Sequence, residues 1–241
     1  MKTFVVTGAT SGIGESLVKS FIGEDVRVIA LGKSEEKLDK LKNNLINKVQ
    51  IKTFLINLEN VSSIKSAIEP IFNEHIDGFI HCAGYSKYAH LRKINYSDFV
   101  QIMNVNFFSF VEILKLLVAN KEKQSNFRAV AISSISSFRG IDIESMYAAS
   151  KGALDSFIKS ISQDLLSNNV QINSIQPVFV DTPMINTIRS VHGAEFDSYV
   201  RNFQPLGLIP TEDIVEQIKF LLYRKSEKVT GTSIYMNAGK I

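Results

Sequence analysis

Apolar residues recur along the chain in two alternating patterns. Short runs rich in β-branched and aromatic residues are bounded by polar or glycine-containing turns, which is typical of buried strands. They cover residues 4–6, 26–31, 51–56, 78–81, 128–132, 171–175 and 233–236. Amphipathic stretches separate these runs and predict helices. The alternation predicts an α/β fold, in which a parallel sheet lies between two layers of helices.

Nothing in the pattern divides the chain. We find no repeat, low-complexity tract or linker rich in proline and glycine, so we expect a single domain over residues 1–241. With 45% hydrophobic and 21% charged residues, the composition suits a globular protein with a substantial core and excludes a disordered one.

The most apolar segment covers residues 107–119. We interpret it as a helix that is too short and too polar to span a membrane. Its apolar residues occupy most of the helical circumference, whereas a helix that packs on one sheet needs a single stripe. We therefore expect part of this surface to be buried against a second subunit.

Charge and cysteine content narrow the function classes. The net charge is only +3, and lysines such as Lys33, Lys37 and Lys40 alternate with acidic residues. Solvated helix surfaces explain this better than a nucleic-acid site. The single Cys82 cannot form an internal disulfide, and residues 1–7 do not resemble a signal peptide. We expect a cytoplasmic protein that binds neither nucleic acid nor membrane.

A glycine-rich turn follows the first predicted strand. Gly8, Gly12 and Gly14 stand between that strand and a helical pattern. Glycines allow a tight turn and bring backbone N–H groups close to a phosphate, and the positive end of the following helix attracts the same charge. The turn therefore predicts a site for a dinucleotide pyrophosphate.

Tyr147 and Lys151 are the candidate catalytic pair. They stand four residues apart in a predicted helix, so both side chains can point into one cleft. A cation beside a phenol favours its ionised form, and we expect Lys151 to lower the Tyr147 pKa toward neutral pH. Ser134 lies thirteen residues before Tyr147. By itself, the pair also fits a buried aromatic residue beside a surface lysine.

Together these motifs resemble the classical short-chain dehydrogenase/reductase family over essentially the whole chain. Residues 7–14 are similar to its cofactor turn, 81–84 to its strand-four motif, 147–151 to its catalytic helix, and 173–182 to its segment beside the nicotinamide. The resemblance implies a Rossmann-type doubly wound sheet. It also implies hydride transfer between NADPH and a carbonyl or alcohol compound, with 3-oxoacyl thioesters among the candidate substrates, and a homodimer or homotetramer.

The same resemblance implies the site residues. The catalytic residues would be Asn106, Ser134, Tyr147 and Lys151, with Tyr147 as the general acid and base. Ser133, Ser136 and Ser137 compete with Ser134, and Asn104 competes with Asn106. We expect no metal. The cofactor would contact Tyr147 and Lys151 together with Gly8, Thr10, Ser11, Gly12, Ile13, Gly14, Lys33, Ser34, Asn57, Leu58, Cys82, Ala83, Gly84, Pro177, Val180 and Thr182.

Cofactor choice depends on the end of the second strand. An acid there would bind the adenosine ribose and repel a 2′-phosphate, but this chain has Gly32, followed by Lys33 and Ser34. A cation and a hydroxyl favour NADP(H), with NAD(H) as the alternative.

Substrate choice would depend on a loop over about residues 183–210. The alternative functions are a non-catalytic NADP-binding sensor or scaffold and a sugar-nucleotide epimerase or dehydratase.

Overall fold

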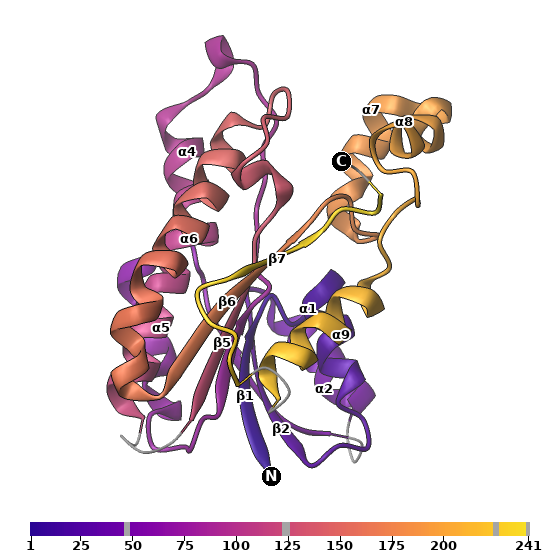
Figure 1. Ribbon diagram of the computed structural model, residues 1–241. Coiled ribbons are helices and arrows are strands. Elements are labelled where there is room, and N and C mark those ends of the chain that lie inside the picture. Colours follow the sequence, from indigo (N-terminus) through magenta and orange to yellow (C-terminus); the bar gives the residue numbers. More distant parts are fainter. Residues whose placement is uncertain (46–48, 122–125, 224–226, 240–241) are drawn as a thin grey trace.

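The computed structural model describes residues 1–45, 49–121, 126–223 and 227–239 (Figure 1). A seven-stranded parallel sheet forms its centre, in the order β3-β2-β1-β4-β5-β6-β7. All the predicted strands are confirmed, and their ends lie within two residues of the expected ones. They are β1 (Lys2–Thr7), β2 (Val26–Gly32), β3 (Gln50–Leu55), β4 (Gly78–His81), β5 (Phe127–Ile132), β6 (Val170–Pro177) and β7 (Ser233–Met236).

Helices cover both faces of the sheet, as Figure 1 shows. α1 (Gly12–Ser20), α2 (Glu35–Leu45) and α9 (Thr211–Leu222) pack on one face. α3 (Ile64–Ile68), α5 (Ser109–Asn120) and α6 (Ser145–Asp164) pack on the other. Successive strand residues point to opposite faces, so Val5 and Val6 of β1 enter different cores. The result is the three-layer, doubly wound fold that the sequence predicts.

The strand order reverses between β1 and β4. β2 and β3 follow β1 on one side, whereas β4 to β7 extend on the other. In sheets of this kind, the crevice for ligands opens at the carboxyl ends of the strands at this reversal. α7 (Asn186–His192) and α8 (Phe196–Phe203) lie within the segment over residues 183–210 and project beyond the sheet (Figure 1). A small core around Phe179 and Phe196 holds this segment together.

The apolar helix is longer than expected. α4 (Tyr96–Met103) continues through a π-helical turn (Asn104–Phe108) into α5. The resulting run of 25 residues is long and apolar enough to cross a membrane by length and composition, so the expectation that it is too short is wrong. Half of its most apolar window is buried inside the protein, and core helices of globular proteins meet the same criterion.

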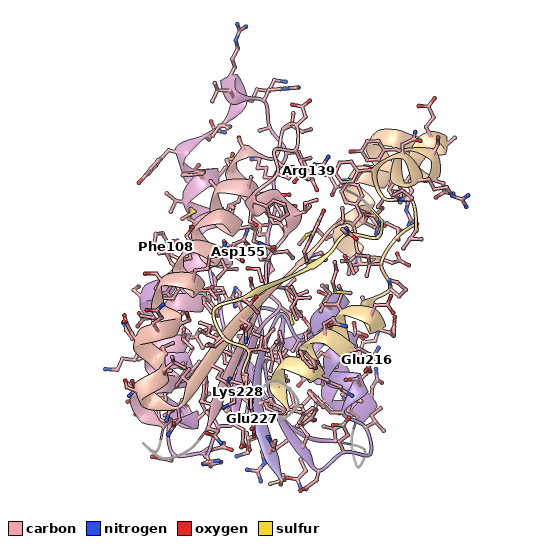
Figure 2. The ribbon with its side chains drawn as sticks, in the orientation of Figure 1. Phe108, Arg139, Asp155, Glu216, Glu227 and Lys228 are labelled. Carbon is pink, nitrogen blue, oxygen red and sulfur yellow. The ribbon has the colours of Figure 1, made fainter. Side chains whose placement is uncertain are left out.

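The protein itself covers much of this helix. Phe110, Ile113, Leu114 and Leu117 are buried in the core on one sheet face. Phe108 is 45% exposed and lies on the outer side of the helices (Figure 2). The unpartnered apolar surface is therefore smaller than the sequence pattern suggests.

Candidate active site

The glycine turn forms a close-packed cradle. Gly8 and Gly12 have φ values of +65° and +52°, which favour glycine. A Cβ atom on Gly8 would lie 2.8 Å from the Ala83 nitrogen, and one on Gly14 would lie 2.3 Å from the Gly8 carbonyl oxygen. Ser11 caps α1 without a side-chain hydrogen bond to the helix. Backbone N–H groups at the start of α1 can therefore approach a pyrophosphate, so the residues fit a dinucleotide.

A cavity of about 360 Å³ extends from this turn along the carboxyl ends of the strands. Eighteen residues of the expected site line it: Gly8, Thr10, Ser11, Gly12, Ile13, Lys33, Ser34, Asn57, Leu58, Cys82, Ala83, Gly84, Ser134, Tyr147, Lys151, Pro177, Val180 and Thr182. Gly14 and Asn106 do not. Gly14 packs behind the turn and Asn106 behind the loop after β4.

One end of the cavity is rich in charged side chains. Lys33 and Ser34 lie there as expected, and Lys37 and Glu59 join them. The Lys33 Nζ atom is 3.8 Å from the Glu59 carboxylate, and the lysine is 77% exposed, so this ion pair is weak. Asn57 uses its side-chain oxygen to accept a hydrogen bond from the Glu59 N–H. Two lysines are thus available to an anion at this end.

Tyr147 and Ser134 meet at the other end. The Tyr147 phenol hydrogen bonds to the Ser134 side chain. The competing serines have other partners. Ser133 donates to the Asp155 carboxylate at 2.8 Å, and Ser137 accepts from the Gln176 amide at 3.0 Å. Ser134 is therefore the serine that the fold directs toward the tyrosine.

Asp155 anchors this region, and the sequence reasoning missed it. It lies on α6 facing the sheet (Figure 2) and is 4% exposed. Its carboxylate accepts hydrogen bonds from Ser133, Ser174 and Gln176 at 2.7–2.8 Å. Asp155 thus ties α6 to the carboxyl ends of β5 and β6. Its position one helical turn after Lys151 is the signal that could have revealed it.

Lys151 does not tune Tyr147 in the expected way. Its ammonium group donates to the Ile132 carbonyl oxygen at 2.7 Å and lies 5.6 Å from the centre of the Tyr147 ring. Burial lowers the pKa of Lys151 to about 8, although the charge of Asp155 opposes this shift. Burial raises the pKa of Tyr147, and the charge of Glu144 raises it further. The expected lowering of the Tyr147 pKa is therefore wrong, because desolvation dominates.

Asn106 holds the loop after β4. Its side chain accepts a hydrogen bond from the Tyr85 N–H at 2.8 Å and donates to the Tyr85 carbonyl and to Ser150, both at 2.9 Å. Asn104 instead donates to the Glu59 carbonyl. The π-helical turn that contains both residues directs Asn106 toward Ser150 of α6, the residue before Lys151.

Comparison with known proteins identifies the family. The sequence model for short chain dehydrogenases matches residues 2–192. The chain belongs to the short-chain dehydrogenase family. It is 29% identical to the 3-oxoacyl-[acyl-carrier-protein] reductase FabG of Thermotoga maritima over 100% of this chain and 98% of that protein. Identity to the Escherichia coli protein of the same name is 24%, over 99% and 96% of the two chains.

Solved structures show the same fold. L-sorbose reductase from Gluconobacter frateurii, complexed with NADPH and L-sorbose, superposes with a TM-score of 0.93 at 18% identity, over 100% of this chain and 96% of that one. A 4-hydroxyisoleucine dehydrogenase complexed with NADH gives 0.92 at 23% identity, over 99% and 98%. The protein is thus a short-chain dehydrogenase, an oxidoreductase that transfers hydride between a nicotinamide cofactor and a carbonyl or alcohol substrate.

Two uncharged side chains of this short-chain dehydrogenase, those of His81 and Cys82, lie at the carboxyl end of β4. The His81 ring is buried and pairs with the Thr7 hydroxyl at 2.9 Å. Burial and the charge of Lys151 lower the pKa of His81 to about 3, so the ring is neutral. Burial also raises the pKa of Cys82 to about 12, which leaves an uncharged thiol on the cavity wall.

Gln204 holds together the base of the loop over residues 183–210 in this dehydrogenase, and sequence reasoning also missed it. Gln204 is fully buried. Its amide accepts from the Phe179 N–H at 2.8 Å and donates to the carbonyl oxygens of Phe179 and Gly207. Met184, Ile185 and Ile188 of the loop reach the cavity. The loop thus gives the cavity an apolar wall.

Proposed function

We propose that this short-chain dehydrogenase is an NADPH-dependent carbonyl reductase. The observation that carries the proposal is the pairing of Tyr147 with Ser134 on the same cavity as the glycine cradle. Because burial raises the Tyr147 pKa, the phenol holds its proton at neutral pH. A protonated acid at this place suits reduction, in which the substrate oxygen must receive a proton.

The proposed roles follow from the contacts. A bound nicotinamide cofactor supplies the hydride. Tyr147 donates its proton to the substrate oxygen, and Ser134 holds that oxygen by a hydrogen bond. Lys151 places a positive charge behind the ring of Tyr147, where it favours the phenolate that remains. Asn106 acts indirectly, because its side chain holds the loop at Tyr85 and contacts Ser150 beside Lys151.

We propose that the dinucleotide binds along the cavity and that its adenosine end lies near Lys33. Gly32 offers no carboxylate to exclude a 2′-phosphate, and Lys33, Ser34 and Lys37 offer cations and a hydroxyl. NAD(H) is the alternative, because Glu59 shares the same end of the cavity.

For the substrate we propose a partly apolar ketone and its alcohol, with 3-oxoacyl thioesters as the first class to test. The relatives named 3-oxoacyl-[acyl-carrier-protein] reductase support that choice. The apolar wall formed by Met184, Ile185 and Ile188 supports it as well. The loop over residues 183–210, within one NADP-binding domain, would select the substrate.

We further propose a cytoplasmic homodimer or homotetramer that pairs through the helices α4, α5 and α6. The exposed Phe108 on the outer side of these helices supports the interface. Light scattering during size-exclusion chromatography should give a multiple of the protomer mass at micromolar concentration. The Phe108→Glu variant should shift toward the monomer, whereas a wild-type monomer would refute the proposal.

The direct test of function is NADPH oxidation against a panel of 3-oxoacyl thioesters, diketones and simple ketones, with NADH in parallel. Turnover with NADPH on any member supports the reductase and identifies its substrate class. Faster turnover with NADH overturns the cofactor proposal alone. NADPH binding without turnover across the panel would favour a sensor or scaffold.

A further inference from the structure

A line of hydrogen bonds connects the neighbourhood of Tyr147 to a buried carboxyl group. Ser134 is the hydrogen-bonding neighbour of the phenol. The Oγ atoms of Ser134 and Ser136 are 3.2 Å apart, and Ser136 Oγ is 2.8 Å from Glu144 Oε2. Glu144 is 5% exposed and lies on the cavity wall. The line therefore connects the proposed proton donor to an acid inside the site.

The protonation state of Glu144 affects the direction of the two hydrogen bonds that link it to Ser136 and Ser134. Each serine hydroxyl has one proton to donate. An ionised Glu144 only accepts, so Ser136 donates to it and must accept from Ser134. The Ser134 proton is then used in the hydrogen bond to Ser136 and is not available to an oxygen atom in the cavity. A protonated Glu144 can donate to Ser136, and Ser136 to Ser134, which leaves the Ser134 proton available to an oxygen atom in the cavity.

The geometry points to Glu144 as a positioning residue. We propose that it sets, through Ser136, whether Ser134 donates a hydrogen bond to the substrate oxygen or accepts one from it. The inference rests on the proposed function, because it deepens the role of Ser134 in that reaction. Its sequence signal is the position of Glu144, three residues before Tyr147, close to one helical turn.

The surroundings of Glu144 let both protonation states form. Burial raises its pKa, and the hydrogen bond with Ser136 lowers it. Among the described residues, its charge acts on phenols from three elements: Tyr88 after β4, Tyr147 on α6 and Tyr199 on α8. Burial and Glu144 raise the pKa of Tyr88 to about 12, so this phenol is neutral. Glu144 thus titrates beside uncharged rings.

The two states differ in how well they stabilise the transition state of one balanced reaction. In reduction, the carbonyl carbon gains a hydride and its oxygen gains the Tyr147 proton, so a ketone becomes an alcohol. In oxidation, the alcohol loses the same hydride and its hydroxyl proton passes to the Tyr147 phenolate, through the same transition state. A Ser134 that donates stabilises the charge that develops on the oxygen in that transition state. Protonated Glu144 therefore favours both directions, and ionised Glu144 slows both.

The test compares pH profiles of kcat/KM in both directions for the wild type, Glu144→Gln, Ser136→Ala and Asp142→Asn. In the wild type, kcat/KM in both directions should fall about ten-fold as the pH rises through the Glu144 pKa, since one hydrogen bond to a charged group has this worth. Glu144→Gln and Ser136→Ala should both lose this transition. Asp142→Asn, which neutralises an exposed acid two residues away, should keep it.

Infrared spectroscopy gives a second readout that needs no turnover. The carbonyl stretch of a protonated carboxylic acid should appear as the pH falls and should be absent in Glu144→Gln. Ser134→Ala, whose side chain does not contact Glu144, should shift this band through Ser136. Identical pH profiles in the wild type and Glu144→Gln, or a band unmoved by Ser134→Ala, would overturn the proposal. A protein that shows the band shift but never turns over would instead overturn the proposed function.

Discussion

Replacing Asp155 by asparagine tests how the fold supports the site. The carboxylate is buried and accepts three hydrogen bonds, from Ser133 and Gln176 on one oxygen and from Ser174 on the other. Asparagine keeps the shape but removes the charge. The amide oxygen of the asparagine must face Gln176, because an amide N–H at that place would meet the N–H donor of Gln176. The amide nitrogen then faces Ser174, whose hydroxyl can turn to accept a hydrogen bond from it.

The magnitude follows from these contacts. A hydrogen bond to a charged group contributes about 1.5–3 kcal/mol, against about 0.5–1.5 kcal/mol for a neutral pair. Two bonds that lose their charged acceptor should therefore cost about 2 kcal/mol of unfolding free energy. For a chain of this size, that lowers Tm by about 4–8 °C. Asp155→Ala removes the charged acceptor from three donors at once and should cost about 3–5 kcal/mol.

The same change should alter the titration of Lys151. Burial lowers the Lys151 pKa to about 8, and the charge of Asp155 opposes this shift. Loss of that charge should therefore lower the Lys151 pKa further. Activity that needs the Lys151 ammonium group is present below the Lys151 pKa and lost above it. The alkaline limb of the pH–rate profile should therefore move to lower pH in the variant. The unfolded chain binds the lysine proton more tightly between the folded pKa of about 8 and the ordinary value of 10.5. The contribution of Lys151 to the unfolding free energy therefore rises with pH between these two values. In the variant the folded-state pKa is lower, so this rise should begin at lower pH.

Thermal unfolding and pH–rate profiles measure both effects. Asp164→Asn, at the exposed end of the same helix, is the matched control and should change neither. An Asp155→Asn variant with the wild-type Tm and the wild-type alkaline limb would refute the reasoning.

Two further changes probe the cofactor end. Gly14→Ala would place a Cβ atom 2.3 Å from the Gly8 carbonyl oxygen, so the turn must open. NADPH affinity measured by fluorescence titration should fall at least ten-fold, and an unchanged affinity would contradict the packing argument. Lys33→Ala combined with Lys37→Ala should lower kcat/KM for NADPH about ten-fold and leave that for NADH nearly unchanged. An equal loss with both cofactors would show that these lysines do not contact a 2′-phosphate.

Much of the fold could be predicted from the sequence because its signals are local. The buried strands are short apolar runs with clear turns at their ends, and β4 and β7 have the predicted bounds. The glycine turn could also be predicted, because its glycines stand between a predicted strand and a predicted helix. Gly8 and Gly12 have the left-handed backbone that favours glycine. These features depend on residues close together in the chain.

The remaining features depend on packing between distant segments. Asp155 meets Ser174 from another strand, and Gln204 meets Phe179 across 25 positions of the chain. The direction of the Tyr147 pKa shift depends on burial, which the spacing to Lys151 does not show. The helix from Tyr96 to Asn120 begins before the apolar segment at residues 107–119, because α4 and the π-helical turn extend it toward its N-terminus.

The central claim is that Tyr147 delivers the proton to a carbonyl substrate in an NADPH-binding cavity. The most direct measurement compares the wild type with Tyr147→Phe, using the best ketone of the panel for turnover and fluorescence titration for NADPH binding. We expect turnover to fall by about two to four orders of magnitude while NADPH affinity changes little, because phenylalanine keeps the ring on the cavity wall. Turnover at the wild-type level would contradict the assignment of Tyr147 as the acid.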